Sequence, residues 1–201
     1  LYQMQAEQNI ETMKAYNVKR VITTCPHCFN SIKNEYPQLG GDFDVEHYSD
    51  TITRLIQDGK IQTSETFTIP GREEEKEPAR VAFHDSCYLG RYNDIYDAPR
   101  KAIQAVPGTE VVEMEKNKKN GFCCGAGGAR WLMEERIGDR VNRERVKQAM
   151  DTKPQVIASS CPYCLMMMED GIQSEGVGDQ VQAMDIAELV AASLPPSGPP
   201  S

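Results

Sequence analysis

Two copies of the motif Cys-Pro-x-Cys, beginning at Cys25 and Cys161, stand 136 residues apart in this chain of 201 residues. Each copy directly follows a β-rich run, 18–24 or 156–160. The proline at the second position suits the first turn of a helix. A unit of strand, Cys-Pro-x-Cys and helix therefore occurs twice, and an internal repeat of this kind indicates two copies of one fold.

The fixed offset also relates Cys28 to Cys164 and Val45 to Val181, so we expect no gap between the copies. The second copy is complete, whereas the first lacks everything before its Cys-Pro-x-Cys. We therefore expect the C-terminal piece of a longer polypeptide. The predicted divisions are the end of a first repeat, a polar linker, a complete second repeat and a disordered Pro/Ser/Gly tail, at 1–59, 60–80, 81–194 and 195–201.

Short β-rich runs alternate with segments of helical periodicity along the whole chain, which predicts an α/β fold. The strands should be mainly parallel and flanked by helices, in two pseudo-repeated halves that face each other across cysteine-bearing loop ends. After the glycine-rich turn at 121–128, the pattern over 129–150 predicts one long helix containing Gly138.

The charge balance excludes one class of partner. A formal net charge of −8 argues against nucleic acid, because phosphate binding needs clustered Lys and Arg. The sequence contains no apolar run near the ~18 residues that a membrane helix requires. Seven cysteines are too few for a secreted disulfide scaffold and favour reduced thiols, so we expect a cytoplasmic protein, or one held at the cytoplasmic membrane face by other regions.

The cysteines of the second repeat form a constellation with regular spacing. There are 35 residues between Cys87 and Cys123, and 36 between Cys124 and Cys161. Thiolates are soft ligands for iron–sulfur clusters, zinc or Cu(I). Five thiolates, counting Cys164, exceed the four that zinc or a cubane cluster needs, and the adjacent pair can reach one centre only if it is large or irregular.

Glycines follow the adjacent cysteine pair in the segment GFCCGAGG. Gly125, Gly127 and Gly128 would allow close backbone approach and positive φ, so that amide N–H groups can point at cluster sulfurs. We therefore predict that these glycines bind the cofactor.

The segments AEQNIETM, CPHCFNSIKNEYP, HDSCYLGRYNDIYDAPR, GFCCGAGG and CPYC resemble the cysteine-rich CCG domain of heterodisulfide reductase subunits B and D and of related iron–sulfur oxidoreductases. The resemblance implies a noncubane [4Fe-4S] cluster held by Cys87, Cys123, Cys124, Cys161 and Cys164. Cys25 and Cys28 would be an incomplete second site. Expected partners are a flavoprotein, a ferredoxin-like iron–sulfur domain, or a membrane haem or quinone subunit.

Two functions are compatible with this pattern. The chain could be an electron-transfer module of a larger oxidoreductase, or a zinc-stabilised interaction module without turnover. Colour and electron paramagnetic resonance distinguish them, because zinc is colourless and silent. Five unrelated core cysteines would need no such spacing.

A few other residues are secondary candidates. His84, next to Asp85, could relay a proton or could be a strand-end histidine bonded to the backbone. His27 is matched by Tyr163 in the second copy, which argues against a ligand role. The pair Arg130 and Trp131 could cover the site or serve as a helix start and a core residue, and the run 166–168 of three methionines fits a helix face that is partly core.

Overall fold

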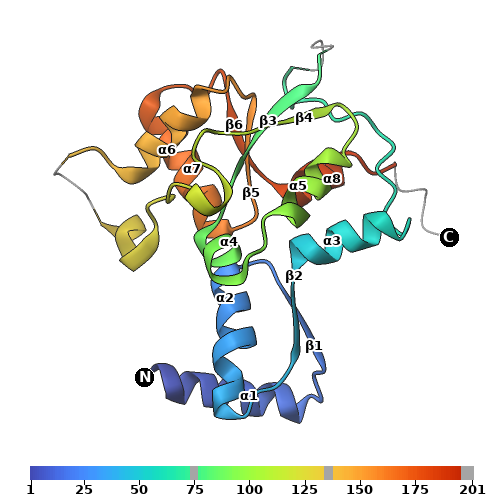
Figure 1. Ribbon diagram of the computed structural model, residues 1–201, viewed down its shortest axis with the longest axis vertical. Coiled ribbons are helices and arrows are strands. Elements are labelled where there is room, and N and C mark those ends of the chain that lie inside the picture. The colour runs from blue at the N-terminus through green and yellow to red at the C-terminus, as the bar shows by residue number, and fades with distance from the viewer. Residues whose placement is uncertain (73–76, 134–137, 196–201) are drawn as a thin grey trace.

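The computed structural model describes residues 1–72, 77–133 and 138–195 (Figure 1). Helices and short parallel strands alternate, which confirms the predicted α/β fold. The helices are α1 Tyr2–Ala15, α2 Pro26–Asn30, α3 Tyr48–Gln57, α4 Cys87–Asn93, α5 Asp97–Gln104, α6 Val141–Met150, α7 Pro162–Glu175 and α8 Ile186–Ala192. The strands are β1 Arg20–Thr23, β2 Asp44–His47, β3 Ala79–His84, β4 Thr109–Val112, β5 Val156–Ser159 and β6 Gln182–Asp185.

The strands form a two-stranded sheet, β1-β2, and a four-stranded sheet of order β4-β3-β5-β6, both entirely parallel. The central strand β5 is buried along its whole length, as expected of a parallel strand covered on both faces. Helices α5 and α8 contribute Ile103 and Leu189 to the core on one face. Helices α6 and α7 contribute Val146 and Met168 to the core on the other.

The pair β1-β2 repeats the pair β5-β6, but with a different spacing at the second strand. In the parallel registers, Val21 lies opposite Val45, and Ile157 lies opposite Ala183. The offset is therefore 136 residues at the first strand and 138 at the second. The expected equivalence of Val45 and Val181 is wrong, because the second repeat has two more residues between its Cys-Pro-x-Cys motif and the strand that follows.

The helix predicted over 129–150 is confirmed at Val141–Met150 and is wrong before it. Residues Gly127–Leu132 form a 3-10 turn in which Gly128 and Ala129 have positive φ, and α6 begins only at Val141. Gly138 also has a positive φ, of +70°, so it is not a helix-interior residue. Residues 134–137 lie outside the described part of the chain.

The segment 60–80 is not solvated throughout. Phe67 and Ile69 are 3% and 5% exposed and belong to the core beneath α5 and α8. The backbone N–H of Phe67 donates to Pro107 O at 2.7 Å. The acidic run that suggested a linker includes residues 73–76, which the structure does not describe, as is also true of tail residues 196–201.

Parallel strands place their carboxyl ends at one edge of a sheet, and the cysteines follow those ends. Cys87 begins α4 after β3, and Cys161 caps α7 after β5. Cys25 occupies the same position before α2 in the first repeat. Helices α2 and α4 pack against each other between the two sheets, so that the cysteine-bearing ends of both repeats lie together (Figure 1).

Candidate metal centre

Segments far apart in the sequence bring two cysteines of the second repeat into contact. Cys164, in the first turn of α7, has its Sγ 3.3 Å from the Sγ of Cys124 in the glycine-rich loop. Cys124, Cys161 and Cys164 are buried, Cys87 is half-buried and Cys123 is exposed. All seven cysteines of the chain are free thiols.

Hydrogen bonds among the thiols lower the pKa of some of them and raise the pKa of another. Hydrogen bonding from Cys123, then from Cys164, strongly lowers the pKa of Cys124, while the pKa of Cys164 is raised well above its ordinary value. A hydrogen bond from Cys164 lowers the pKa of Cys161 to about 5, despite burial. Thiolate is the ligand form of cysteine, so the site is poised to bind a cation in place of the shared protons.

Among the three predicted glycines, Gly125 has the clearest structural role. Its φ is +90°, and its N–H donates to Cys123 Sγ at 3.3 Å. A Cβ at this position would lie 3.0 Å from Val141 Cβ at the start of α6. Gly127 and Gly128 have open space where a Cβ would be, and of these two only Gly128 has a positive φ.

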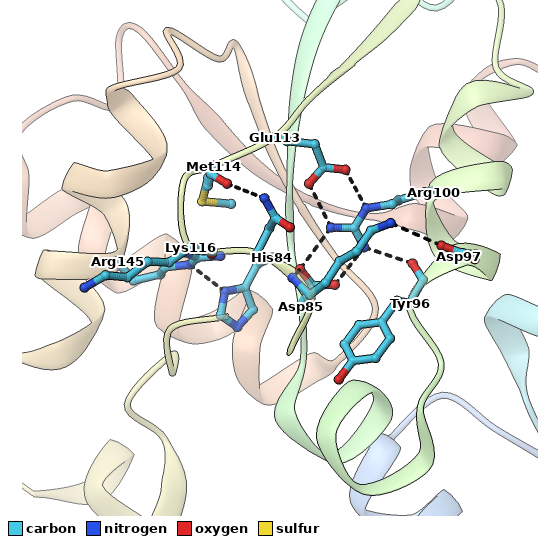
Figure 2. Close-up of polar contacts among 11 residues, drawn as sticks. His84, Asp85, Tyr96, Asp97, Arg100, Glu113, Met114, Lys116 and Arg145 are labelled. Atoms are coloured by element: carbon cyan, nitrogen blue, oxygen red, sulfur yellow. Dashed lines mark hydrogen bonds and ion pairs between the residues drawn. The ribbon is translucent and has the colours of Figure 1, made fainter. Parts of the chain in front are cut away.

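His84 at the end of β3 is buried, and its ligand nitrogen lies within 4.8 Å of the sulfurs of Cys124 and Cys164. Its Nδ1 accepts a hydrogen bond from Arg145 Nε at 3.0 Å, rather than from the backbone (Figure 2). Arg145 is not among the residues predicted from the sequence. Its position in the polar pattern of α6 gave no sign that its side chain is fully buried.

The neighbouring Asp85 holds the loop that leads to the cysteine pair. Its carboxylate accepts two hydrogen bonds from Arg100, at 2.7 and 3.0 Å, and one from the backbone N–H of Lys118 at 2.7 Å. Arg100 also bonds to Glu113, which precedes that loop (Figure 2). The network ties β3, α5 and the segment before Cys123 into one unit.

The first repeat contributes His27 to the same region. Its Nδ1 lies 3.6 Å from Cys25 Sγ, and its ring centroid lies 4.3 Å from that of Tyr88 in the second repeat. Hydrogen bonding to Cys161, then to Cys25, raises the pKa of His27 to about 10. His27 therefore joins one cysteine from each repeat, a contact that its mismatch with Tyr163 did not predict.

The remaining candidates are accounted for by their packing. Trp131 is 39% exposed and its ring lies 6.0 Å from that of Tyr163, so it is not a core residue. Arg130 is exposed. Met167 and Met168 are buried in the core that contains Cys124, Cys161 and Cys164.

The donor set and its surroundings fit an iron–sulfur cluster. Cys87, Cys124, Cys161 and Cys164 would hold it, together with Cys123 from the rim. The hydroxyls of Ser86, Ser159 and Ser160, beside Cys87 and Cys161, are buried without a hydrogen-bond partner in the described residues. Such orphaned donors can be satisfied by cluster sulfur, which accepts hydrogen bonds.

Comparison with protein-family models finds a match to the cysteine-rich domain, CCG, over residues 2–33 and 81–169, more than half of the chain. The chain belongs to the CCG cysteine-rich domain family. The two matched segments contain all seven cysteines, so the family pattern and the converging loops concern the same residues.

The curated relatives of this CCG chain have names of iron–sulfur and redox proteins. A probable iron–sulfur-binding oxidoreductase FadF of Bacillus subtilis is 42% identical over 96% of the chain and 26% of its own length. An EtfAB:quinone oxidoreductase of Syntrophomonas wolfei is 39% identical over 94% of the chain and 26% of its own length. A subunit of the dihydromethanophenazine:CoB–CoM heterodisulfide reductase of Methanosarcina barkeri is 31% identical over 94% of the chain and 44% of its own length.

The chain thus spans less than half the length of these relatives, and about a quarter of the first two. Among its described helices, none is long and apolar enough to cross a bilayer.

Proposed function

We propose that the chain is an electron-transfer module that binds a noncubane [4Fe-4S] cluster through Cys87, Cys123, Cys124, Cys161 and Cys164. The observation that carries the proposal is the 3.3 Å contact between the sulfurs of Cys124 and Cys164, with a ring nitrogen of His84 within 4.8 Å of both. When bound, the cluster supplies one-electron redox chemistry. The chain's own residues hold the sulfurs, exclude water and direct N–H groups at them.

The position of the first repeat supports a second, adjoining site. Cys25 and Cys28 begin α2 as Cys161 and Cys164 begin α7, and His27 lies between Cys25 and Cys161. We propose that Cys25 and Cys28 are part of a second cluster site whose other ligands come from another segment. Electrons could then pass between the sites across the interface of the repeats.

The names of the relatives suggest possible donors and acceptors of the electrons. The EtfAB:quinone oxidoreductase suggests transfer from a flavoprotein toward quinone, and the heterodisulfide reductase suggests reduction of a disulfide. We propose that the module works with a flavoprotein, a ferredoxin-like iron–sulfur domain, or a membrane haem or quinone subunit.

The test is anaerobic reconstitution of the 201-residue chain with iron and sulfide. We expect iron and acid-labile sulfide in a ratio of about four to four for the complete motif, a brown colour, and a paramagnetic signal in one redox state. A zinc site formed by His84, Cys124 and Cys164 with one more thiolate is the alternative that the geometry allows. Stoichiometric zinc without sulfide would overturn the proposal.

A further inference from the structure

Arg145 is a fully buried cation without a carboxylate partner among the described residues. Its side chain is 0% exposed, and its hydrogen-bond acceptors are His84 Nδ1, Lys116 O and Gln148 Oε1, all of them neutral. Its Nη2 has no hydrogen-bond partner in the described part of the chain. Burial lowers the pKa of Arg145 to about 10, so the guanidinium remains charged at neutral pH.

The contrast with Arg100 shows what is missing. Arg100 is also buried, but its charge is matched by Asp85 and Glu113 (Figure 2). Asp85 is already engaged by Arg100, and no described carboxylate forms an ion pair with Arg145. An uncompensated buried charge is strongly destabilising, so a chain that keeps Arg145 needs a source of negative charge nearby.

His84 connects Arg145 to such a source. Because its Nδ1 accepts from Arg145, the neutral imidazole carries its proton on Nε2 and can only donate from there. The sulfurs of Cys124 and Cys164 lie within 4.8 Å of a ring nitrogen of His84. His84 thus lies between a buried cation, which donates to its Nδ1, and the sulfurs of the metal centre.

We propose that Arg145 is the buried counter-ion of the metal centre, and that it acts through His84, which donates a hydrogen bond to the sulfur of Cys124. Arg145 is a positioning residue in this arrangement, and the proposal rests on the cluster-binding function proposed above. A positive charge and an N–H···S hydrogen bond both favour the more negative, reduced form of a cluster. The pair therefore sets the reduction potential of the site upward and stabilises the loaded protein.

The experiment compares three variants of the reconstituted 201-residue chain. Arg145→Gln keeps an N–H donor for His84 but removes the charge, and Arg145→Lys keeps the charge. Arg143→Gln removes an equal charge from the same helix, where Arg143 forms a surface pair with Glu175 at 2.6 Å. The readouts are the midpoint potential, from redox titration followed by electron paramagnetic resonance, and the rise in Tm on cluster loading.

We expect Arg145→Gln to have a more negative potential and a smaller rise in Tm than the parent chain. Arg145→Lys should lie close to the parent, and Arg143→Gln should match it. Loss of cluster uptake in a folded Arg145→Gln chain, with uptake kept in the other two, would also support the proposal. If Arg145→Gln does not fold, Arg145→Lys decides, since a parent-like potential supports the role of the charge and a strongly lowered one contradicts it.

An Arg145→Gln chain with the potential and Tm rise of the parent would overturn the proposal while leaving cluster binding intact. Failure of the parent chain itself to take up iron and sulfide would instead overturn the proposed function. A purely structural Arg145 would change the stability of the metal-free and loaded forms equally. The Tm rise on loading would then be unchanged.

Discussion

The sulfur atoms of Cys124 and Cys164 lie 3.3 Å apart, although the two residues are 40 positions apart in the sequence. One comes from an irregular glycine-rich loop and the other from the first turn of α7. Two buried thiols at this distance cannot both be ionised unless a metal ion binds them. Without a metal ion, at least one proton stays on the pair. The contact therefore lies at the centre of the proposed ligand set of the second repeat.

Replacing either member of this pair should remove the cofactor. We expect Cys124→Ser and Cys164→Ser to lower iron retention after anaerobic desalting by at least about tenfold, the lower end of the loss seen when even an outer-shell partner is removed. The matched control is Cys28→Ser, at the position in the first repeat that corresponds to Cys164. Iron content per chain is the measurement, and equal retention in all three variants would contradict the assigned ligands.

The glycine loop offers a test that leaves every thiol in place. Gly125→Ala puts a side chain on a residue with φ of +90° and within 3.0 Å of Val141 Cβ. The strained backbone costs about 1–2 kcal/mol and moves the amide that donates to Cys123. Gly127→Ala is the control, because it meets open space at ordinary φ.

We expect iron retention to fall in Gly125→Ala and to stay at the parent level in Gly127→Ala, with both chains folded by circular dichroism. The reverse ranking would show that the loop tip, and not its start, shapes the site.

The repeat and the cysteine spacing could be predicted because they depend on local sequence. A β-rich run followed by Cys-Pro-x-Cys forces a strand to end where a helix begins, so Cys25 and Cys161 occupy helix N-caps as expected. The break after the glycine loop could not be read from periodicity. Ala129 takes a positive φ there, which no pattern of charged and apolar residues reveals.

Contacts between residues far apart in the sequence could not be predicted. Arg145 lies in a polar helix segment, yet its side chain reaches His84, 61 positions earlier. Phe67 and Ile69 belong to a segment whose composition is polar, yet two apolar side chains are enough to fix it on the core. Such contacts depend on how α6 and segment 60–80 pack on the rest of the fold. The composition of these segments does not reveal where they pack.

Cys25 should react faster than Cys28 in the metal-free, reduced chain at pH 7. Although burial opposes ionisation, the hydrogen bond from His27 lowers the pKa of Cys25, whereas burial raises that of Cys28. At a given pH, a thiol with a lowered pKa has a larger thiolate fraction than one with a raised pKa, and it loses reactivity as the pH falls through its own pKa. Cys28, with a raised pKa, should gain reactivity only at alkaline pH.

Iodoacetamide labelling followed by peptide mass spectrometry measures both sites at once. We expect Cys25 to be labelled before the more exposed Cys28, and His27→Gln to slow labelling at Cys25 but not at Cys28. Labelling in order of exposure, with Cys28 first, would show that His27 does not activate Cys25.

Asp85 should contribute to stability through its buried pair with Arg100. Both side chains are nearly inaccessible, at 4% and 6% exposure, and Asp85 also accepts the backbone N–H of Lys118. Asp85→Asn keeps the shape and an acceptor for that N–H, but leaves Arg100 with Glu113 alone. Breaking a buried pair costs about 3–5 kcal/mol, and we expect a loss of about 3 kcal/mol in the free energy of unfolding because Glu113 compensates in part.

Urea denaturation of the metal-free chain at pH 7 measures this loss, and Asp97→Asn is the control. Asp97 is 72% exposed and lies 3.5 Å from Lys118 Nζ, so its removal should change the free energy of unfolding by less than about 1 kcal/mol. Because Asp85 anchors the segment that leads to Cys123, the Asp85→Asn chain should also retain less iron after reconstitution. An Asp85→Asn chain as stable as Asp97→Asn would mean that Glu113 alone compensates the charge of Arg100, and that the loop is held in place by the cysteines themselves.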